Sequence, residues 1–208
     1  MAKLLYIESS PRKERSHSIK IARVFLEEYS LVNPDDSIKA IDLWDKTLPD
    51  FNEDRLNAKY SLMHGQNPTE SEQEAWKEIE SLFEEFNDAD KYVFSVPMWN
   101  FGFPYTLKHY IDVITQPGLA WSHSPDEGFK GLVTGKALVV YATGGSYAPG
   151  SETEAFDLQK PSFEGWLGFI GLTDISRLVM APTLASQEDL TAQEIVLSGE
   201  AKKIAQVF

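Results

Sequence analysis

Residues 4–18 read LLYIESSPRKERSHS, and this stretch indicates the fold of the whole chain. Leu4 to Ile7 form a short apolar run that is typical of a strand buried on both faces, and a polar loop follows it. Beyond the loop, apolar residues recur at helical spacing from Ile19 to Tyr29. A buried strand, a loop and a helix are the opening unit of a doubly wound α/β fold.

The same alternation of strand and helix continues to the end of the chain. The apolar patterns predict further strands at 38–44, 92–96, 137–143 and 178–180. They predict helices at 75–86 behind a capping box that starts at Thr69, at 107–114, at 163–170 and within 187–206. Residues 45–68 are interpreted as a long polar connection. We therefore predict a single α/β domain over residues 1–208, with a five-stranded parallel sheet and helices on both faces.

Charge and composition exclude several classes of function. The 208 residues carry 19 basic and 32 acidic side chains, a formal net charge of −13, which repels nucleic-acid backbones and anionic lipid surfaces. We expect no nucleic-acid partner, no membrane association and a cytoplasmic location, since no apolar run approaches the roughly 20 residues of a membrane span. The chain has no cysteine and no histidine pair at metal-ligand spacing, so we expect no metal site. Any redox chemistry must come from a bound cofactor.

The predicted order of strands and helices indicates where a ligand would bind. In open parallel sheets, ligands bind beyond the carboxyl ends of the strands. Three loops leave the predicted strands at that edge, and they cover residues 9–18, 97–104 and 142–150. We expect the chemistry of the protein to lie there.

The first loop has the features of a phosphate cradle. Ser10, Ser16, His17 and Ser18 place hydroxyl and backbone N–H groups at the positive end of a helix dipole. Basic residues at 12, 13 and 15 add positive charge. The loop lacks Gly-x-Gly-x-x-Gly, which favours a mononucleotide phosphate over a dinucleotide pyrophosphate. Ordinary N-capping by serine is the alternative.

The second and third loops suit a flat heteroaromatic ring. Residues 97–104 read PMWNFGFP, which combines apolar and aromatic contact surface with the amide of Asn100. Gly144 and Gly145 follow the fourth strand and allow close approach of the backbone to a ring edge. The alternative is an aromatic turn that packs into the core.

Together these segments carry a family resemblance over nearly the whole chain. The start Ser-Pro-Arg-x-x-x-Ser-His-Ser, the block Pro97-Met-Trp-Asn-Phe101 and the following Phe-Pro-Tyr-Thr-Leu-Lys resemble the FMN-dependent NADH-azoreductase and quinone reductase family, which is flavodoxin-like. The stretches Gly131–Lys136 and Leu167–Gly171 match as well. The family usually has Ser-Arg before the glycine pair, where this chain has Ala142-Thr143.

The resemblance implies a homodimer that binds FMN and passes a hydride, by a ping-pong mechanism, from NADH or NADPH to quinones, azo dyes or nitroaromatics. The flavin carries the chemistry, so no catalytic side chain is required. The resemblance implies that the phosphate is held by Ser10, Ser16, His17 and Ser18, and the ring by Met98, Trp99, Asn100, Phe101, Ala142, Thr143, Gly144 and Gly145. Four aromatic residues are candidates for a lid over flat substrates: Trp121, Tyr147, Phe163 and Trp166.

Three other functions are alternatives to this one. A serine hydrolase built on Ser146 is disfavoured, because all four histidines precede that serine in the chain. An electron-carrier flavodoxin shares the fold and the cofactor, and fold analogy cannot separate the two. A flavin-free binding module is the third alternative.

Overall fold

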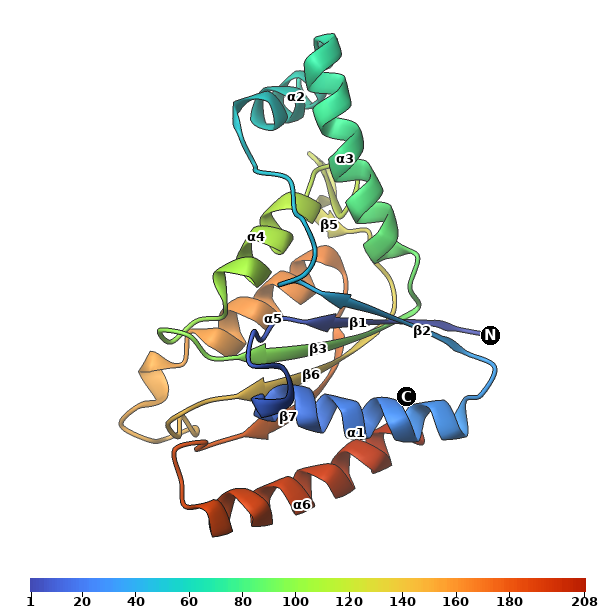
Figure 1. Cartoon of the computed structure of the whole chain (residues 1–208). Coiled ribbons are helices and arrows are strands. Elements are labelled where there is room, and N and C mark those ends of the chain that lie inside the picture. Colours follow the sequence, from blue (N-terminus) through green and yellow to red (C-terminus); the bar gives the residue numbers. More distant parts are fainter.

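A computed structural model describes all 208 residues and shows one sheet between two layers of helices (Figure 1). The five strands of the sheet are parallel and lie in the order β2-β1-β3-β6-β7. The predicted fold class is therefore confirmed. The elements are β1 (Lys3–Glu8), a 3-10 turn (Lys13–Arg15), α1 (His17–Val32), β2 (Ser37–Asp42), α2 (Glu53–Met63), α3 (Glu70–Asn87), β3 (Lys91–Pro97), α4 (Tyr105–Ile114), β4 (Trp121–Ser124), β5 (Gly128–Gly131), β6 (Lys136–Ala142), a second 3-10 turn (Glu154–Phe156), α5 (Gln159–Ile170), β7 (Asp174–Met180) and α6 (Gln187–Ala205).

Alternate side chains of the central strands enter two separate cores, as expected for strands covered on both faces. Leu4 and Tyr6 point into the core under α1 and α6. Leu5 and Ile7 point into the larger core under α3, α4 and α5. Because β1, β3 and β6 are parallel neighbours, the loops that follow them lie at one edge of the sheet.

Two elements differ from the prediction. The segment 45–68, predicted as a polar connection, contains α2, whose only buried residue is Ala58. The segment after α4 contains a small antiparallel hairpin of β4 and β5, which the sequence analysis missed. In addition, β7 begins at Asp174, four residues before the predicted strand at 178–180.

The segment Gly131–Lys136 packs closely against the end of α5. Gly171 ends the helix in the left-handed region, with φ at +115°. A Cβ atom at Gly131 would lie 2.3 Å from the backbone nitrogen of Gly171, so the hairpin approaches the helix end as closely as glycine allows. This contact holds the hairpin against α5.

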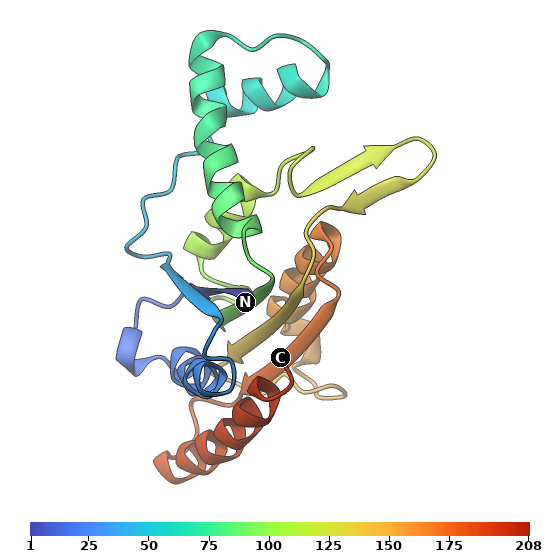
Figure 2. The same cartoon turned by 90° about the vertical axis from the view of Figure 1, so that its right-hand side faces the viewer.

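Figure 2 shows two projections from the body of the molecule. One is α2 with the adjoining half of α3, and the other is the hairpin. None of the helices combines the length and the apolar character needed to cross a bilayer.

Candidate functional site

The loop after β1 leads into α1 with a set of unsatisfied donors. Ser16 is the N-cap residue of α1, with extended φ and ψ of −87° and 122°, but its side chain makes no capping hydrogen bond. The backbone N–H groups of His17, Ser18 and Ile19 have no acceptor in the chain. Ser18 and Ile19 are fully buried, and buried N–H groups without partners are rare and costly. The start of α1 is therefore built to receive an anion.

The side chains around this helix start are held by contacts within the chain. The hydroxyls of Ser16 and Ser18 lie 3.2 Å apart and pair with each other. Ser16 and Ser18 are both buried at the start of the helix. The ring of His17 faces away from the loop, with Nδ1 3.3 Å from a carboxylate oxygen of Glu194 in α6. His17 therefore contributes its backbone N–H group, and not its ring, to the candidate phosphate site.

Part of the positive charge of the loop is neutralised by ion pairs within the chain. Lys13 forms an ion pair with Asp42 at the end of β2, and its Nζ lies 3.5 Å from Glu8 and 3.8 Å from Asp45. It therefore anchors the loop to the sheet and contributes no free charge to a phosphate site. Arg12 and Arg15 are exposed.

The loop after β3 contains a tight turn. Trp99 and Gly102 exchange two backbone hydrogen bonds of 3.0 Å, and both residues between them have positive φ, +47° at Asn100 and +70° at Phe101. Both of these residues are exposed at the edge of the sheet, and their backbone N–H groups have no acceptor in the chain. The turn therefore presents an amide side chain, backbone donors and the aromatic surface of Trp99 together.

The loop after β6 lies directly beside this turn. The N–H group of Met98 donates to the carbonyl oxygen of Ala142 at 2.8 Å. Thr143 is buried, and its hydroxyl donates to the carbonyl oxygen of Gly145 at 2.7 Å. The N–H groups of Gly144 and Gly145 have no acceptor in the chain. Thr143 therefore shapes the loop from within, while the two glycines supply free donors.

A buried polar contact joins the first two loops beneath the edge. The hydroxyl of Ser9 donates to the carbonyl oxygen of Ser95 at 2.7 Å, and the Ser95 hydroxyl lies 3.0 Å from the phenol of Tyr6. Burial raises the pKa of Tyr6, so its phenol stays protonated and serves as a hydrogen-bond donor. These hydrogen bonds fix the first two loops to each other beneath the edge of the sheet.

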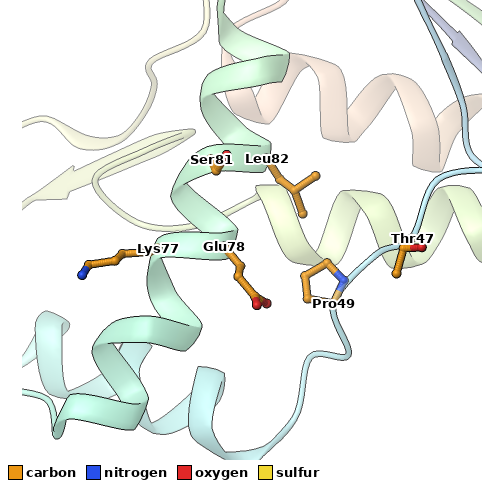
Figure 3. A pocket seen from close by; sticks show the side chains of 6 residues that line it. All are labelled: Thr47, Pro49, Lys77, Glu78, Ser81 and Leu82. Atoms are coloured by element: carbon orange, nitrogen blue, oxygen red, sulfur yellow. The ribbon is translucent and has the colours of Figure 1, made fainter.

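Two larger clefts lie outside the three loops. One of about 730 Å³ lies beside α4 and is lined by Tyr105 and Trp166 among others. Another of about 460 Å³ lies between α3 and residues 47–49 and is lined by polar side chains such as Lys77 and Glu78 (Figure 3). None of its lining residues belongs to the three loops. A smaller cavity of about 290 Å³ adjoins the third loop and is lined by Thr143, Ser146 and Tyr147 among others.

Comparisons with known proteins give the family. A family model described as a flavodoxin-like fold matches residues 2–202. An FMN-dependent NADH:quinone oxidoreductase of Desulfotalea psychrophila is 47% identical over 199 residues, covering 95% of this chain and 92% of its own. The chain belongs to this family. A second relative of that name, from Burkholderia lata, is 42% identical with full coverage of both chains. An azoreductase of Bacillus anthracis, 27% identical and fully covered in both chains, superimposes with a TM-score of 0.90.

A solved structure of an FMN-dependent NADH-azoreductase from Bacillus anthracis in complex with FMN provides a further comparison. It is 27% identical, it covers 99% of this chain and 100% of its own, and the TM-score is 0.83. The donor set of the present chain fits FMN. The unpaired N–H groups at the start of α1 suit its phosphate, and the free amides of Asn100, Phe101, Gly144 and Gly145 suit the polar edge of its ring.

The four predicted lid residues do not form a group in this structure. Phe163 has no exposed surface and packs edge-on against Phe94 in the core, so it cannot be part of a lid. Trp121 lies in the hairpin between α4 and β6, which projects from the body of the molecule (Figure 2), and its ring packs against those of Phe129 and Phe169. Trp166 is half-buried beside Phe163, and its Nε1 donates to the hydroxyl of Thr115 at 2.9 Å.

Of the four, only Tyr147 lies beside the predicted ring site. The sequence analysis also missed Trp44, which follows β2 and joins the first two loops. Its Nε1 donates to the carbonyl oxygen of Ser9 at 3.0 Å, and its ring lies 5.7 Å from that of Trp99. The adjacency of β1 and β2 was the signal that could have found it, because their carboxyl ends meet at one edge.

Proposed function

We propose that this chain is an FMN-dependent NADH:quinone oxidoreductase that also reduces azo compounds. The observation that carries the proposal is the start of α1, where three consecutive N–H groups lack acceptors beside the ring turn at 98–101. The two sites are linked through the contact of Ser9 with Ser95. Fold, family and donor chemistry therefore point to the same cofactor.

The residues of the chain have distinct roles in this proposal. FMN, when bound, accepts a hydride from NADH and delivers it to the substrate. The N–H groups of His17, Ser18 and Ile19 hold the phosphate. Asn100 and the two glycines of the third loop orient the ring by its polar edge. Met98 and Trp99 supply apolar contact, which excludes water from the ring face.

We infer the electron donor and the electron acceptors from the family and from the net charge of the chain. The relatives are named for NADH, and the net charge of −13 disfavours the extra 2′-phosphate of NADPH. We propose quinones, azo dyes and nitroaromatics as acceptors, with Tyr147 as a contact for their flat rings. Comparing kcat/KM for NADH and NADPH tests the choice of donor.

A homodimer is part of the proposal, and the two projections support it. Exposed apolar side chains lie on α2 at Leu56, Tyr60, Leu62 and Met63, and on the hairpin at Phe129. Such side chains on projecting elements are typical of surfaces that another chain covers. Sedimentation at micromolar concentration tests this, and a monomer contradicts it. The cytoplasmic location also stays a prediction, which cell fractionation tests.

Steady-state turnover separates the proposed enzyme from an electron carrier. We expect the FMN-loaded protein to oxidise NADH when menadione or an azo dye is the only acceptor. A protein that binds FMN but shows no turnover with either acceptor would be a carrier, and the enzymatic proposal would fail. A protein that does not take up FMN at all would be a flavin-free binding module.

A further inference from the structure

The turn that faces the proposed ring site is strained. Phe101 has φ of +70°, a region that residues with a Cβ atom adopt only when the surrounding structure imposes it. Asn100 before it has φ of +47°, which asparagine tolerates better. The strain at Phe101 therefore calls for support from outside the turn.

That support comes from the segment just before and at the start of α5. The N–H group of Leu158 donates to the carbonyl oxygen of Phe101 at 3.1 Å. The ring of Phe156 packs against the ring of Phe101 with centroids 5.4 Å apart. The side chain of Gln159 donates from Nε2 to the carbonyl oxygen of Val96 at 3.0 Å. One bond thus reaches the strained residue, and the other holds the strand end from which the turn starts.

Gln159 has the properties of a residue kept for this one hydrogen bond. It is fully buried, and its side-chain oxygen has no partner. A buried amide that satisfies only its donor costs free energy that an apolar side chain of similar shape would avoid. Its N–H bond to Val96 is therefore its contribution to this part of the molecule.

We propose that Gln159 is a positioning residue for the flavin ring. By fixing Val96, it sets the height of Met98 to Phe101 above the sheet, and with Leu158 it keeps the free N–H groups of the turn directed at the ring edge. The segment that ends at Gln159 begins at the third loop, so it ties together both loops proposed to hold the ring. This inference rests on the proposed function, because it assigns a role toward the bound FMN.

The test compares Gln159→Met with Gln187→Met. Methionine keeps the shape of glutamine but removes the donor. Gln187 is the first residue of α6, as Gln159 is of α5, but it is exposed, and its Nε2 lies 3.5 Å from the hydroxyl of Thr191 in its own helix. We expect Gln159→Met to raise the Kd for FMN about three- to tenfold, as for the loss of one positioning hydrogen bond, and to shift the flavin potential. Gln187→Met should change neither quantity.

Gln159→Glu provides the second variant. Its ionised carboxylate faces the Val96 carbonyl as a second acceptor, whereas the protonated acid donates to it. We expect FMN affinity of this variant to recover toward that of the wild type as the pH falls. The proposal is overturned if both Gln159 variants keep the wild-type Kd and potential, whatever happens to their Tm, or if Gln187→Met has the same effect. Wild-type protein that does not bind FMN would instead refute the proposed function.

Discussion

Replacing Ser16 by aspartate should stabilise the protein and weaken FMN binding at the same time. Ser16 already has N-cap geometry, but its hydroxyl pairs with Ser18 and leaves the helix start uncapped. An aspartate there accepts hydrogen bonds from the N–H groups of the first turn. A cap of this kind contributes about 1 kcal/mol, and in a chain of 208 residues this corresponds to a rise in Tm of about 2 to 4 °C.

The same carboxylate occupies the donors that the phosphate of FMN needs. Two hydrogen bonds to an ionised phosphate contribute about 3 to 6 kcal/mol together, so the Kd for FMN should rise about 10²- to 10⁴-fold. Riboflavin, which lacks the phosphate, should lose much less affinity. Titration of flavin fluorescence with both ligands, together with thermal unfolding of the flavin-free protein, measures all three quantities.

The matched control is Ser186→Asp. Ser186 is the N-cap of α6, but its hydroxyl already accepts from the N–H group of Asp189 at 3.2 Å. This variant should gain no stability and bind FMN normally. The reasoning is refuted if Ser16→Asp lowers the Tm of the flavin-free protein, or if it weakens FMN and riboflavin equally.

Two further predictions follow from the core and from charge. Phe163→Ala should lower the free energy of unfolding by about 3 to 5 kcal/mol, as for other buried aromatic residues, and chemical denaturation should show this loss; a variant of normal stability with altered acceptor preference would return Phe163 to the lid. Burial alone would raise the pKa of Glu85, but its ion pairs, including Lys46 at 2.6 Å, outweigh burial and lower it. The contribution of Glu85 to the stability of the fold is therefore present above the pKa of a glutamate in the unfolded chain. It is lost as the pH falls through the lower pKa of Glu85 in the folded protein. The destabilisation caused by Glu85→Gln should shrink as urea titrations move from neutral to acid pH, and a pH-independent difference would contradict this.

The sheet could be predicted from the sequence because its strands are buried on both faces. Leu4 to Ile7 form a continuous apolar run, and Tyr92 to Val96 form one that only Ser95 interrupts; both are buried in the structure. By contrast, α2 buries only Ala58 and so has no apolar stripe, although Asn52 and the acidic residues after it marked its start. The hairpin strand Trp121–Ser124 has one large apolar residue and no clear alternation.

The candidate site was predictable at the level of loops but not of side chains. Parallel strand order alone brings the loops after β1, β3 and β6 together. The direction of His17 depends on Glu194, which lies 177 residues away in the sequence. The role of Gln159 depends on a backbone oxygen 63 residues away. Such long-range contacts leave no local pattern, and the aromatic residue Phe163 has the same appearance in a core as in a lid.

The most direct test of the account is the absorbance of the FMN-loaded protein during one anaerobic reaction cycle. NADH should bleach the oxidised-flavin band of the wild-type protein, and menadione added afterwards should restore it. The Ser16→Asp variant at the same FMN concentration should show little bound flavin and little bleaching. Wild-type protein that binds no FMN, or whose bound flavin NADH does not reduce, would contradict the account.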